Sequence, residues 1–447
     1  MRGVAARRSR GPAVLVIGAG ASGLAAARTL AASGVEVMVL EACDRVGGRV
    51  DTRPDPVLGV PLELGAEFVH GRPPAVTALA SEGGLALREV PDRHLRSRSH
   101  GLAGAEASFA RAQEILAMGE RRDEPFARLL ARPSVRRRFG EPDRELARSF
   151  VEGFYLADPR SASTVVLARM TRALEEIGGE RAYRVEGGYG ALLAVLARAV
   201  RGSIRLSTTV EEIRWRPGAV EVRARGAAGS PLAPVRADRA VVTLPLGVLR
   251  AGSVRFAPAL LRKRRALSAL AVGPVVKVLL RFRRSVWERR GARRMSFLHA
   301  PGEAFPVFWT LAPDPAPILA GWAGGPPAAR LSGRPPLAIA RTALGSLARA
   351  LGTVPAALEA DLDGWRVADW SANPHARGGY AVFPVGSAWA SRALAEPVEE
   401  TLFFAGEATA GPGSAGTVDG ALASGERAAR EVLESLGEAG DRARRSG

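Results

Sequence analysis

The sequence predicts an α/β fold in which a parallel sheet is built from both ends of the chain and interrupted by a second, α+β unit. Three observations predict it. Residues 13–49 have the pattern of apolar strand, glycine turn, alanine-rich helix and second strand. Residues 401–436 have the order of strand, glycine-rich turn and long helix again. Between them lie strand patterns, "SIRLSTTVEEIRW", "AVEVRARG" and "DRAVVTLPLGVL", and a mostly helical, arginine-rich stretch over 92–182.

Length and composition describe a folded chain. At 447 residues, with 47% hydrophobic residues, the chain has room for more than one domain and a large core. No apolar run reaches the roughly 18 residues that a spanning helix needs, so we expect no membrane span. The single Cys43 excludes an internal disulfide and favours a reducing, cytoplasmic location. With only five scattered histidines, we also expect no metal site.

The charge is strongly positive, with 63 basic and 45 acidic residues and a net charge of +18. Such a charge can indicate a nucleic-acid partner. Here the arginines mostly lie singly, and the densest basic runs, at 135–140 and 260–267, lack neighbouring stacking aromatics apart from Phe139. We therefore expect solvated helix faces and no nucleic-acid partner.

The first twelve residues superficially resemble a twin-arginine export signal. The apolar segment that follows is broken at once by Gly18 and Gly20, however. We interpret residues 1–12 as a flexible tail.

Residues 14–23 carry the G-x-G-x-x-G pattern of a dinucleotide-binding turn. Residues 14–17 form a short apolar run, which is typical of a strand buried on both faces. Gly18 permits the tight turn, Gly20 lets the backbone approach a pyrophosphate, and Gly23 lets the helix pack on the strand. The N–H groups and the dipole of the helix then face the phosphates.

A second strand, "EVMVLE", ends at Glu41, eighteen residues after Gly23. A carboxylate there can accept hydrogen bonds from both ribose hydroxyls of an adenosine. The segment "EACDRVGGRV" follows, in which Arg45 and Arg49 frame two glycines. These features together predict a dinucleotide site.

"EACDRVGGRV" resembles the E-x-x-x-R-x-G-G-R extension of flavoproteins. From residue 14 to about residue 436 the chain resembles the flavin-containing amine oxidase family, which includes monoamine and polyamine oxidases, L-amino acid oxidases and lysine-specific histone demethylases. "ELGAEFVHG", "STTVEEI", "VVTLPLGVL", "GPVVKVLLRF", "DWSANPHARGGYAVFPVG" and "FFAGEATAGPGSAGTVDGALASG" stand in the family's order.

The resemblance implies bound FAD, with Arg49 at the pyrophosphate, Val210 at the adenine and Glu407 at the ribityl hydroxyls. A helix beginning near Thr417 would direct its N-terminus at the flavin, where negative charge accumulates on reduction. The predicted FAD contacts are Gly18, Gly20, Ser22, Gly23, Glu41, Arg49, Gly65, Ala66, Glu67, Phe68, Val210, Gly406, Glu407, Thr417 and Val418.

The resemblance also implies the reaction. A neutral amine passes a hydride equivalent to flavin N5, the imine hydrolyses, and oxygen reoxidises the flavin to give hydrogen peroxide. Lys277 matches the family lysine that holds the flavin N5 atom through a water, and it is therefore the predicted catalytic residue. It is one of only two lysines in the chain. A strand lysine that reaches the surface is the alternative. The other lysine, Lys263, is expected to meet solvent.

Tyr380, Thr417 and His70 are the predicted substrate contacts. Tyr380 matches one aromatic wall beside the amine, Thr417 occupies the opposing position, and His70 matches a substrate-facing histidine. A core tyrosine and a structural histidine are the alternatives. Gly378 and Gly379 stand where some family members carry a cysteine that binds flavin covalently, so noncovalent FAD is implied. Asp419 stands where many members carry histidine, and no role is implied for it.

The predicted architecture is a discontinuous, Rossmann-like FAD-binding domain with an inserted α+β substrate-binding domain. The FAD-binding domain comprises 13–91, 183–253 and 395–436. The substrate-binding domain comprises 92–182 and 254–394. Residues 437–447 are expected to form a second flexible tail.

The predicted function is an FAD-dependent oxidase of a monoamine, polyamine or amino acid, with molecular oxygen as the second substrate. The positive chain disfavours polycations unless the mouth of the site is locally acidic, so we mildly prefer a monoamine or amino acid. A carotenoid-desaturase or protoporphyrinogen-oxidase-like flavoprotein is one alternative. A noncatalytic flavin-binding protein associated with nucleic acid is another.

Overall fold

One half of the fold is built on a parallel sheet. The computed structural model describes residues 12–98 and 101–445, so most of the predicted N-terminal tail lies outside the described residues. Five strands pair in the order β10-β2-β1-β14-β23, and every neighbouring pair is parallel. This is the 3-2-1-4-5 order of a dinucleotide-binding fold. The strands are β1 (Val14–Ile17), β2 (Val37–Leu40), β10 (Ile204–Arg205), β14 (Arg239–Val242) and β23 (Leu402–Phe404).

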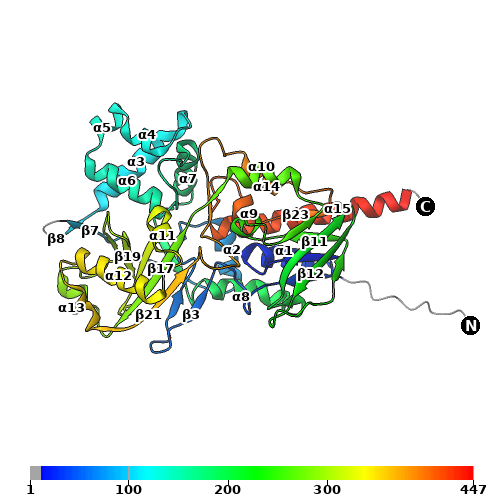
Figure 1. The fold of residues 1–447 in the computed structure, drawn as a ribbon, viewed down its shortest axis with the longest axis horizontal. Helices are drawn as coiled ribbons and strands as arrows, with labels where there is room; N and C mark the ends of the chain where they lie inside the picture. The colour runs from blue at the N-terminus through cyan, green and yellow to red at the C-terminus, as the bar shows by residue number, and fades with distance from the viewer. Residues whose placement is uncertain (1–11, 99–100, 446–447) are drawn as a thin grey trace, which may run out of the picture.

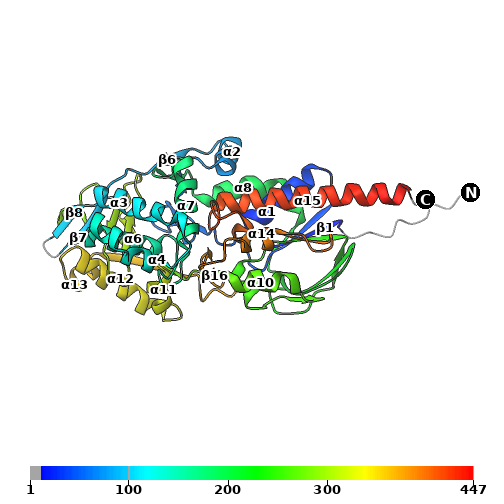
Figure 2. The ribbon, with the colours of Figure 1, turned by 90° about the horizontal axis from the view of Figure 1, so that it is seen from above.

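Two layers cover this sheet. Side chains alternate along a strand, so Val14 and Val16 pack against helices, whereas Leu15 and Ile17 pack against a second sheet, β13-β12-β11-β15. Figure 2 shows α8, α1 and α15 side by side on the helical face. The elements of the two layers are α1 (Ala21–Ala32), α2 (Pro74–Glu82), α8 (Tyr189–Ala199), α15 (Val418–Arg445), β11 (Thr209–Arg216), β12 (Ala219–Arg225), β13 (Val235–Ala237) and β15 (Arg255–Ala257).

The other half contains a mixed sheet of seven strands, in the order β21-β17-β20-β19-β18-β7-β8. It lies at the opposite end of the molecule from the carboxyl-terminal end of α15 (Figure 1). The fold class predicted from the sequence is therefore confirmed. The elements of this half are β7 (His94–Arg98), β8 (Gly101–Gly104), β17 (Val275–Phe282), β18 (Phe297–His299), β19 (Val307–Thr310), β20 (Ile318–Gly324), β21 (Leu362–Asp369), α11 (Gly325–Leu331), α12 (Pro336–Ala350) and α13 (Pro355–Glu359).

Strand β17 divides its side chains between two environments. Val276, Val278 and Leu280 lie in the core formed with α11 to α13. The opposite face carries Lys277 and Leu279, and Leu279 packs with residues of the 60–68 segment. The alternation of the strand thus places Lys277 on the face directed toward the other half of the molecule.

The stretch 92–182 is not helical from its start. It opens with the hairpin strands β7 and β8, and β7 pairs in parallel with β18. The sequence signal for this hairpin is weak because its strands contain arginine, serine and glycine, and the pairing with β18 supplies what local propensity lacks. The helices that follow share one core. They are α3 (Glu106–Ala117), α4 (Phe126–Ala131), α5 (Pro133–Arg138), α6 (Glu141–Gly153) and α7 (Thr164–Glu176).

Shorter elements connect the two halves. The boundary predicted at 253/254 places β15 in the substrate-binding domain, but β15 pairs in parallel with β11, which belongs to the predicted FAD-binding domain. The domain division itself stays a prediction. No helix in the described part of the chain has the length and apolar character to cross a membrane. The connecting elements are β3 (Thr52–Pro54), β4 (Pro61–Glu63), β5 (Val69–His70), β6 (Leu87–Glu89), β9 (Ala182–Val185), α9 (Leu246–Arg250), α10 (Leu261–Ala269), β16 (Ala271–Val272), β22 (Ala381–Val382) and α14 (Ala390–Ala395).

Helix α15 continues through Arg445, where the sequence predicted a flexible tail from residue 437. Residues 437–445 contain three arginines, two alanines and one glutamate, which have high helix propensity, beside two glycines and one aspartate. They extend a helix that already has many turns.

The expectation that Lys263 meets solvent is wrong, because its residue exposure is 2%. Its ammonium donates to the carbonyl oxygens of Ala393 at 2.8 Å and Leu394 at 3.1 Å, and also to that of Glu396. The last carbonyls of a helix lack intrahelical partners, and these lie at the end of α14. A compact ammonium with three donors can satisfy all of them at once. Burial lowers the pKa of Lys263 to about 8.

Candidate active site

A large cavity of about 1030 Å³ runs between the two halves of the molecule. It begins at the carboxyl ends of β1 and β2 and reaches the seven-stranded sheet. Every FAD, substrate and catalytic residue predicted from the sequence lines it, except Gly23. Ligands of parallel α/β sheets bind at this edge, at the point where the strand order reverses.

The glycines at the start of α1 are needed for two different reasons, one set by the fold and one by a bound pyrophosphate. Gly18 has φ +106, and a Cβ on Gly23 would lie 1.9 Å from the carbonyl oxygen of Gly18. These two glycines are therefore required by the fold itself. A Cβ on Gly20 would meet only the carbonyl oxygen of Gly47, at 3.9 Å, so it would project into the cavity. Contacts within the protein do not explain why residue 20 is glycine, whereas a pyrophosphate beside it would.

Glu41 and Val210 line the far end of the cavity, as expected for an adenosine site. The carboxylate of Glu41 accepts hydrogen bonds from the backbone N–H of Ala19 at 2.6 Å and of Cys43 at 2.9 Å. These bonds hold the carboxylate at the edge of the sheet and leave each oxygen a second lone pair. Burial and the charge of Glu41 raise the pKa of Cys43 to about 11, so its thiol stays protonated.

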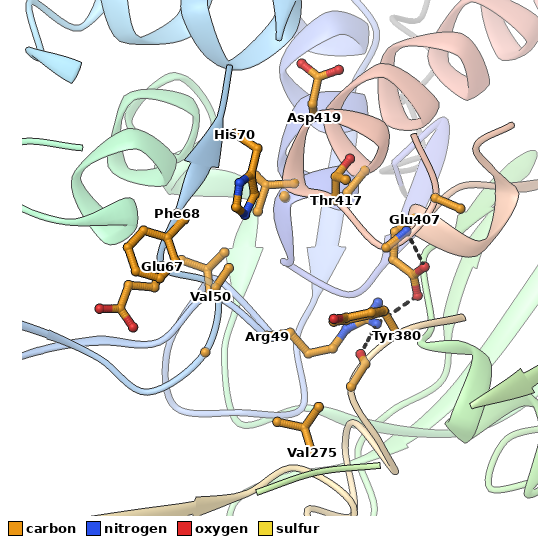
Figure 3. A pocket seen from close by; sticks show the side chains of 18 of the residues that line it. Arg49, Val50, Glu67, Phe68, His70, Val275, Tyr380, Glu407, Thr417 and Asp419 are labelled. Atoms are coloured by element: carbon orange, nitrogen blue, oxygen red, sulfur yellow. Dashed lines mark hydrogen bonds and ion pairs between the residues drawn. The ribbon is translucent and has the colours of Figure 1, made fainter. Parts of the chain in front are cut away.

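Arg49 and Glu407, which were assigned to different parts of FAD, contact each other. The guanidinium of Arg49 donates to Glu407 Oε1 at 2.8 Å and to the carbonyl oxygen of Gly379 at 2.5 Å (Figure 3). Glu407 Oε2 accepts from the backbone N–H of Ala381 and Gly416. This network ties the "GGR" loop to both sides of the Tyr380 segment. Arg45 donates to three carbonyls of its own loop and does not reach toward Glu407.

The segment 65–70 forms one wall of the cavity. A Cβ on Gly65 would lie 1.8 Å from the carbonyl oxygen of Arg49, so the two backbones pack directly on each other. The ring of His70 packs edge-on against Phe154, with centroids 5.1 Å apart. Burial lowers the pKa of His70 to about 4, so the imidazole is neutral at neutral pH.

Lys277 reaches this wall from β17, and its side chain is fully buried. Its ammonium pairs with the carboxylate of Glu67 and donates to the carbonyl oxygen of Gly65 at 3.3 Å. Glu67, predicted as a flavin contact, thus uses its carboxylate for an ion pair within the wall. The alternative in which Lys277 reaches the protein surface is wrong, because Glu67 and Gly65 provide a buried partner and a buried acceptor.

Tyr380, Thr417, His70 and Phe68 surround the same space (Figure 3). The hydroxyl of Tyr380 donates to the carbonyl oxygen of Phe154, and the ring packs over Gly416. Thr417 Oγ1 accepts from the backbone N–H of Gly420 at 2.9 Å, so Thr417 caps the N-terminus of α15. The helix terminus therefore opens into the cavity beside Tyr380.

The structure explains Asp419, for which the sequence indicated no role. Its Oδ1 accepts from the backbone N–H of Ala75 at 2.9 Å and of Val76 at 3.2 Å. These are free donors in the first turn of α2, which begins with two prolines and has no cap of its own. Asp419 thus caps α2 from the first turn of α15 and holds the two helices together.

We expect Asp419→Ala to lower the free energy of unfolding by about 1 kcal/mol, the usual value of a helix cap. Asp419→Asn keeps an oxygen acceptor at the same place, so its free energy of unfolding should fall by only part of this amount. Urea denaturation of the two variants beside the wild type measures the difference. Equal stability of all three proteins would contradict the capping role.

Exposed carboxylates line the mouth of the cavity, and no pattern in the sequence predicted them. Among the lining residues, five exposed carboxylates stand beside one exposed arginine, Arg181. Glu175 and Glu180 form no ion pair among the described residues, whereas Glu89 is paired with Arg181, Glu114 with Arg138, and Asp92 contacts His94. The carboxylates are Glu89, Asp92, Glu114, Glu175 and Glu180. They come from separate elements, so no local sequence pattern joins them.

A polar pair on the wall formed by the seven-stranded sheet was also missed. His94 Nδ1 lies 2.8 Å from His299 Nε2, and His94 Nε2 lies 2.9 Å from an oxygen of Asp92. Burial and the nearby charges of His94 and Arg96 lower the pKa of His299 to about 3. The two histidines are 205 positions apart, so only the pairing of β7 with β18 brings them together.

Comparisons with known proteins agree with this geometry. The family model described as flavin containing amine oxidoreductase matches residues 21–125 and 109–433. Polyamine oxidase 2 of Arabidopsis thaliana is 29% identical, over 96% of this chain and 91% of its own length. Lysine-specific histone demethylase 1B of Mus musculus is 26% identical over 94% of this chain, which spans about half (52%) of that protein.

Two solved structures share the fold. Wild-type putrescine oxidase bound to putrescine superposes with a TM-score of 0.75 at 24% identity, covering 95% of this chain and 99% of that one. Cyclohexylamine oxidase from Brevibacterium oxydans IH-35A superposes with a TM-score of 0.76 at 24% identity, covering 96% and 100%.

Proposed function

This chain belongs to the flavin-containing amine oxidoreductase family, and from that premise we propose that it oxidises an amine that carries a second positive charge, a diamine or polyamine. The chain is an FAD-dependent amine oxidase acting on CH–NH or CH–NH2 donors. The observation that carries the proposal is the acidic mouth of the cavity in a chain of net charge +18.

The residues along the cavity fit FAD. The open face of Gly20 and the N-terminus of α1 suit a pyrophosphate, and Glu41 and Val210 suit the adenosine. The N-terminus of α15, capped by Thr417, suits the end of the flavin at which negative charge develops. When bound, FAD accepts two electrons from the substrate C–N group and passes them to oxygen.

We further propose that FAD is held without a covalent bond. The segment before Tyr380 offers Gly378 and Gly379, which have no nucleophilic side chain. The single cysteine lies at the adenosine end, with its thiol protonated. Release of all the flavin by acid precipitation is the expected result.

Each end of the substrate then meets a different environment. The amine to be oxidised must be neutral, and it would lie between Tyr380 and Thr417, near a neutral His70. The distal ammonium would lie toward Glu175 and Glu180, where solvent and carboxylates favour its charge. An amino-acid carboxylate would be repelled at this mouth, and the one exposed arginine there is already paired with Glu89.

We expect putrescine and spermidine to bleach the flavin anaerobically at lower concentration than butylamine or L-amino acids do. In the double variant Glu175→Gln/Glu180→Gln, the KM for the diamine should rise by about twofold to thirtyfold, because each exposed ion pair contributes about 0.2–1 kcal/mol. The KM for butylamine should change much less. Stopped-flow absorbance and peroxide release at low ionic strength measure both effects.

The matched control is Glu176→Gln, which neutralises an exposed neighbour of Glu175 on α7 that does not line the cavity. It should leave both KM values unchanged. Bleaching by L-amino acids or monoamines alone would overturn the proposed substrate class. Colourless protein that cannot be reconstituted with FAD would overturn the whole assignment.

A further inference from the structure

The wall of the cavity contains a buried cluster of three charged side chains. Glu67 pairs with Lys277 through Oε2 and with Arg184 through Oε1, the latter at 2.5 Å. The side chains of Glu67, Lys277 and Arg184 are 5%, 0% and 10% exposed. Burial alone would raise the pKa of Glu67, but the two cations outweigh it and hold that pKa below its ordinary value.

Glu67 is held from three directions. Trp309 of β19 donates its indole N–H to Glu67 Oε1 at 2.9 Å. Arg184 of β9 is itself fixed, because it donates to the carbonyl oxygens of Thr310 at 2.9 Å and Ala312 at 2.8 Å. Its guanidinium also lies 4.7 Å from the ring centroid of Phe68. The carboxylate therefore has one position, and Lys277 on β17 meets it there.

The charges around Lys277 do not balance without Glu67. Two buried cations share this one carboxylate, and Glu63 of β4 is a second carboxyl near Lys277. Glu63 bonds instead to Thr52 and to the backbone N–H of Tyr189, and burial raises its pKa to about 7. An arginine cannot release its proton in a protein, whereas a desolvated lysine can. If Glu67 were lost, Lys277 and not Arg184 would therefore be the cation able to release a proton.

We propose that Glu67 is the positioning residue that keeps the Lys277 ammonium charged and fixed against the Gly65 carbonyl on the wall of the cavity. The inference rests on the proposed FAD site, which Gly65 and Lys277 both line. Trp309 and Arg184 hold Glu67, and Glu67 holds Lys277. The charge that Lys277 presents to the cavity is thus set by a residue that itself performs no chemistry.

The test is a pH titration of the visible spectrum of oxidised, FAD-loaded protein without any amine. In the wild type, the midpoint of the change in the flavin bands at alkaline pH serves as the reference. In Glu67→Gln, which keeps an acceptor for Trp309 but removes the charge, the midpoint should move to lower pH by about one unit or more. The direction follows because removing a negative partner disfavours the ammonium.

Two further variants fix the assignment. In a Lys277→Met background, Glu67→Gln should no longer move the alkaline transition, because the ionisation of flavin N3–H that remains does not depend on that ion pair. Arg184→Met, which removes the competing cation, should move the midpoint to higher pH. An unchanged midpoint in a folded, FAD-loaded Glu67→Gln protein would overturn the proposal. This readout needs no turnover, so failure of every amine in the substrate screen would leave it standing.

If Glu67→Gln does not bind FAD, the apoproteins decide the question, and a Glu67→Gln protein that is unfolded without urea counts as having its midpoint at zero. Urea midpoints of Glu67→Gln, Lys277→Met and the double variant form a cycle. If Glu67 serves Lys277, the double variant should be more stable than Glu67→Gln alone, because no unpaired ammonium remains buried. Simple addition of the two losses would show that Glu67 serves Arg184 and Trp309 only.

Discussion

Lys277→Met is expected to bind FAD and to slow flavin reduction or reoxidation by orders of magnitude, on the scale of the 10²–10⁴-fold that a positioned proton-transfer group contributes. Lys277 is the only lysine that lines the cavity, and it is buried on the wall beside Gly65. Methionine is close in length, so Glu67 would keep Arg184 and Trp309 as partners and the wall should survive. Anaerobic stopped-flow reduction by amine and subsequent mixing with oxygen measure the two half-reactions.

Lys263→Met is the matched control for this variant. Lys263 is the other buried lysine of the chain, but it caps α14 and does not line the cavity. Its replacement should lower the urea midpoint and leave both rates per bound flavin unchanged. Wild-type rates in Lys277→Met would make Lys277 a structural residue.

Gly20→Ala is expected to abolish tight FAD binding while leaving the apoprotein folded. The backbone of Gly20 has φ −73 and ψ −178, which alanine adopts without strain, and a Cβ there meets no protein atom closer than 3.9 Å. The free energy of unfolding should therefore change by less than about 1 kcal/mol. The added methyl group would occupy the space needed by the pyrophosphate. Flavin fluorescence titration of the apoprotein and urea denaturation measure the two quantities separately.

Gly23→Ala, in contrast, is expected to destabilise the fold itself. Its Cβ would lie 1.9 Å from the carbonyl oxygen of Gly18, a backbone atom in the turn between β1 and α1. The helix must then move away from the strand, at a cost of about 1–3 kcal/mol or more. The division of roles between the two glycines would be contradicted if Gly20→Ala lowered the free energy of unfolding, or if Gly20→Ala bound FAD as tightly as the wild type.

Much of the FAD-binding half could be predicted from the sequence because its signals are local. Gly18, Gly20 and Gly23 lie within six residues at the junction of β1 and α1, and Glu41 directly follows β2. Backbone sterics and a short strand–turn–helix unit dictate these positions whatever the rest of the chain does. The predicted pairing of Arg49 and Glu407 with FAD could not include their contact with each other, because 358 positions separate them.

Three features that the sequence did not predict have one physical cause. Lys263, the hairpin of β7 and β8, and Asp419 all satisfy backbone groups of elements that are distant in sequence. A buried N–H or carbonyl must find a partner, but the sequence around it does not say which side chain will supply it. The same holds for the acidic mouth, whose Glu89, Glu114 and Glu175 come from three separate elements.

The sequence by itself determined the fold class and the dinucleotide turn, because strand periodicity and glycine geometry act over a few neighbouring residues. The other predicted site residues were implied by the family resemblance. Only the tertiary structure decided how charge is distributed there. It paired Glu67 with both Lys277 and Arg184 and gathered carboxylates at the mouth of a positively charged protein. Electrostatic interactions depend on distance and burial in space, and neither can be read from positions along the chain.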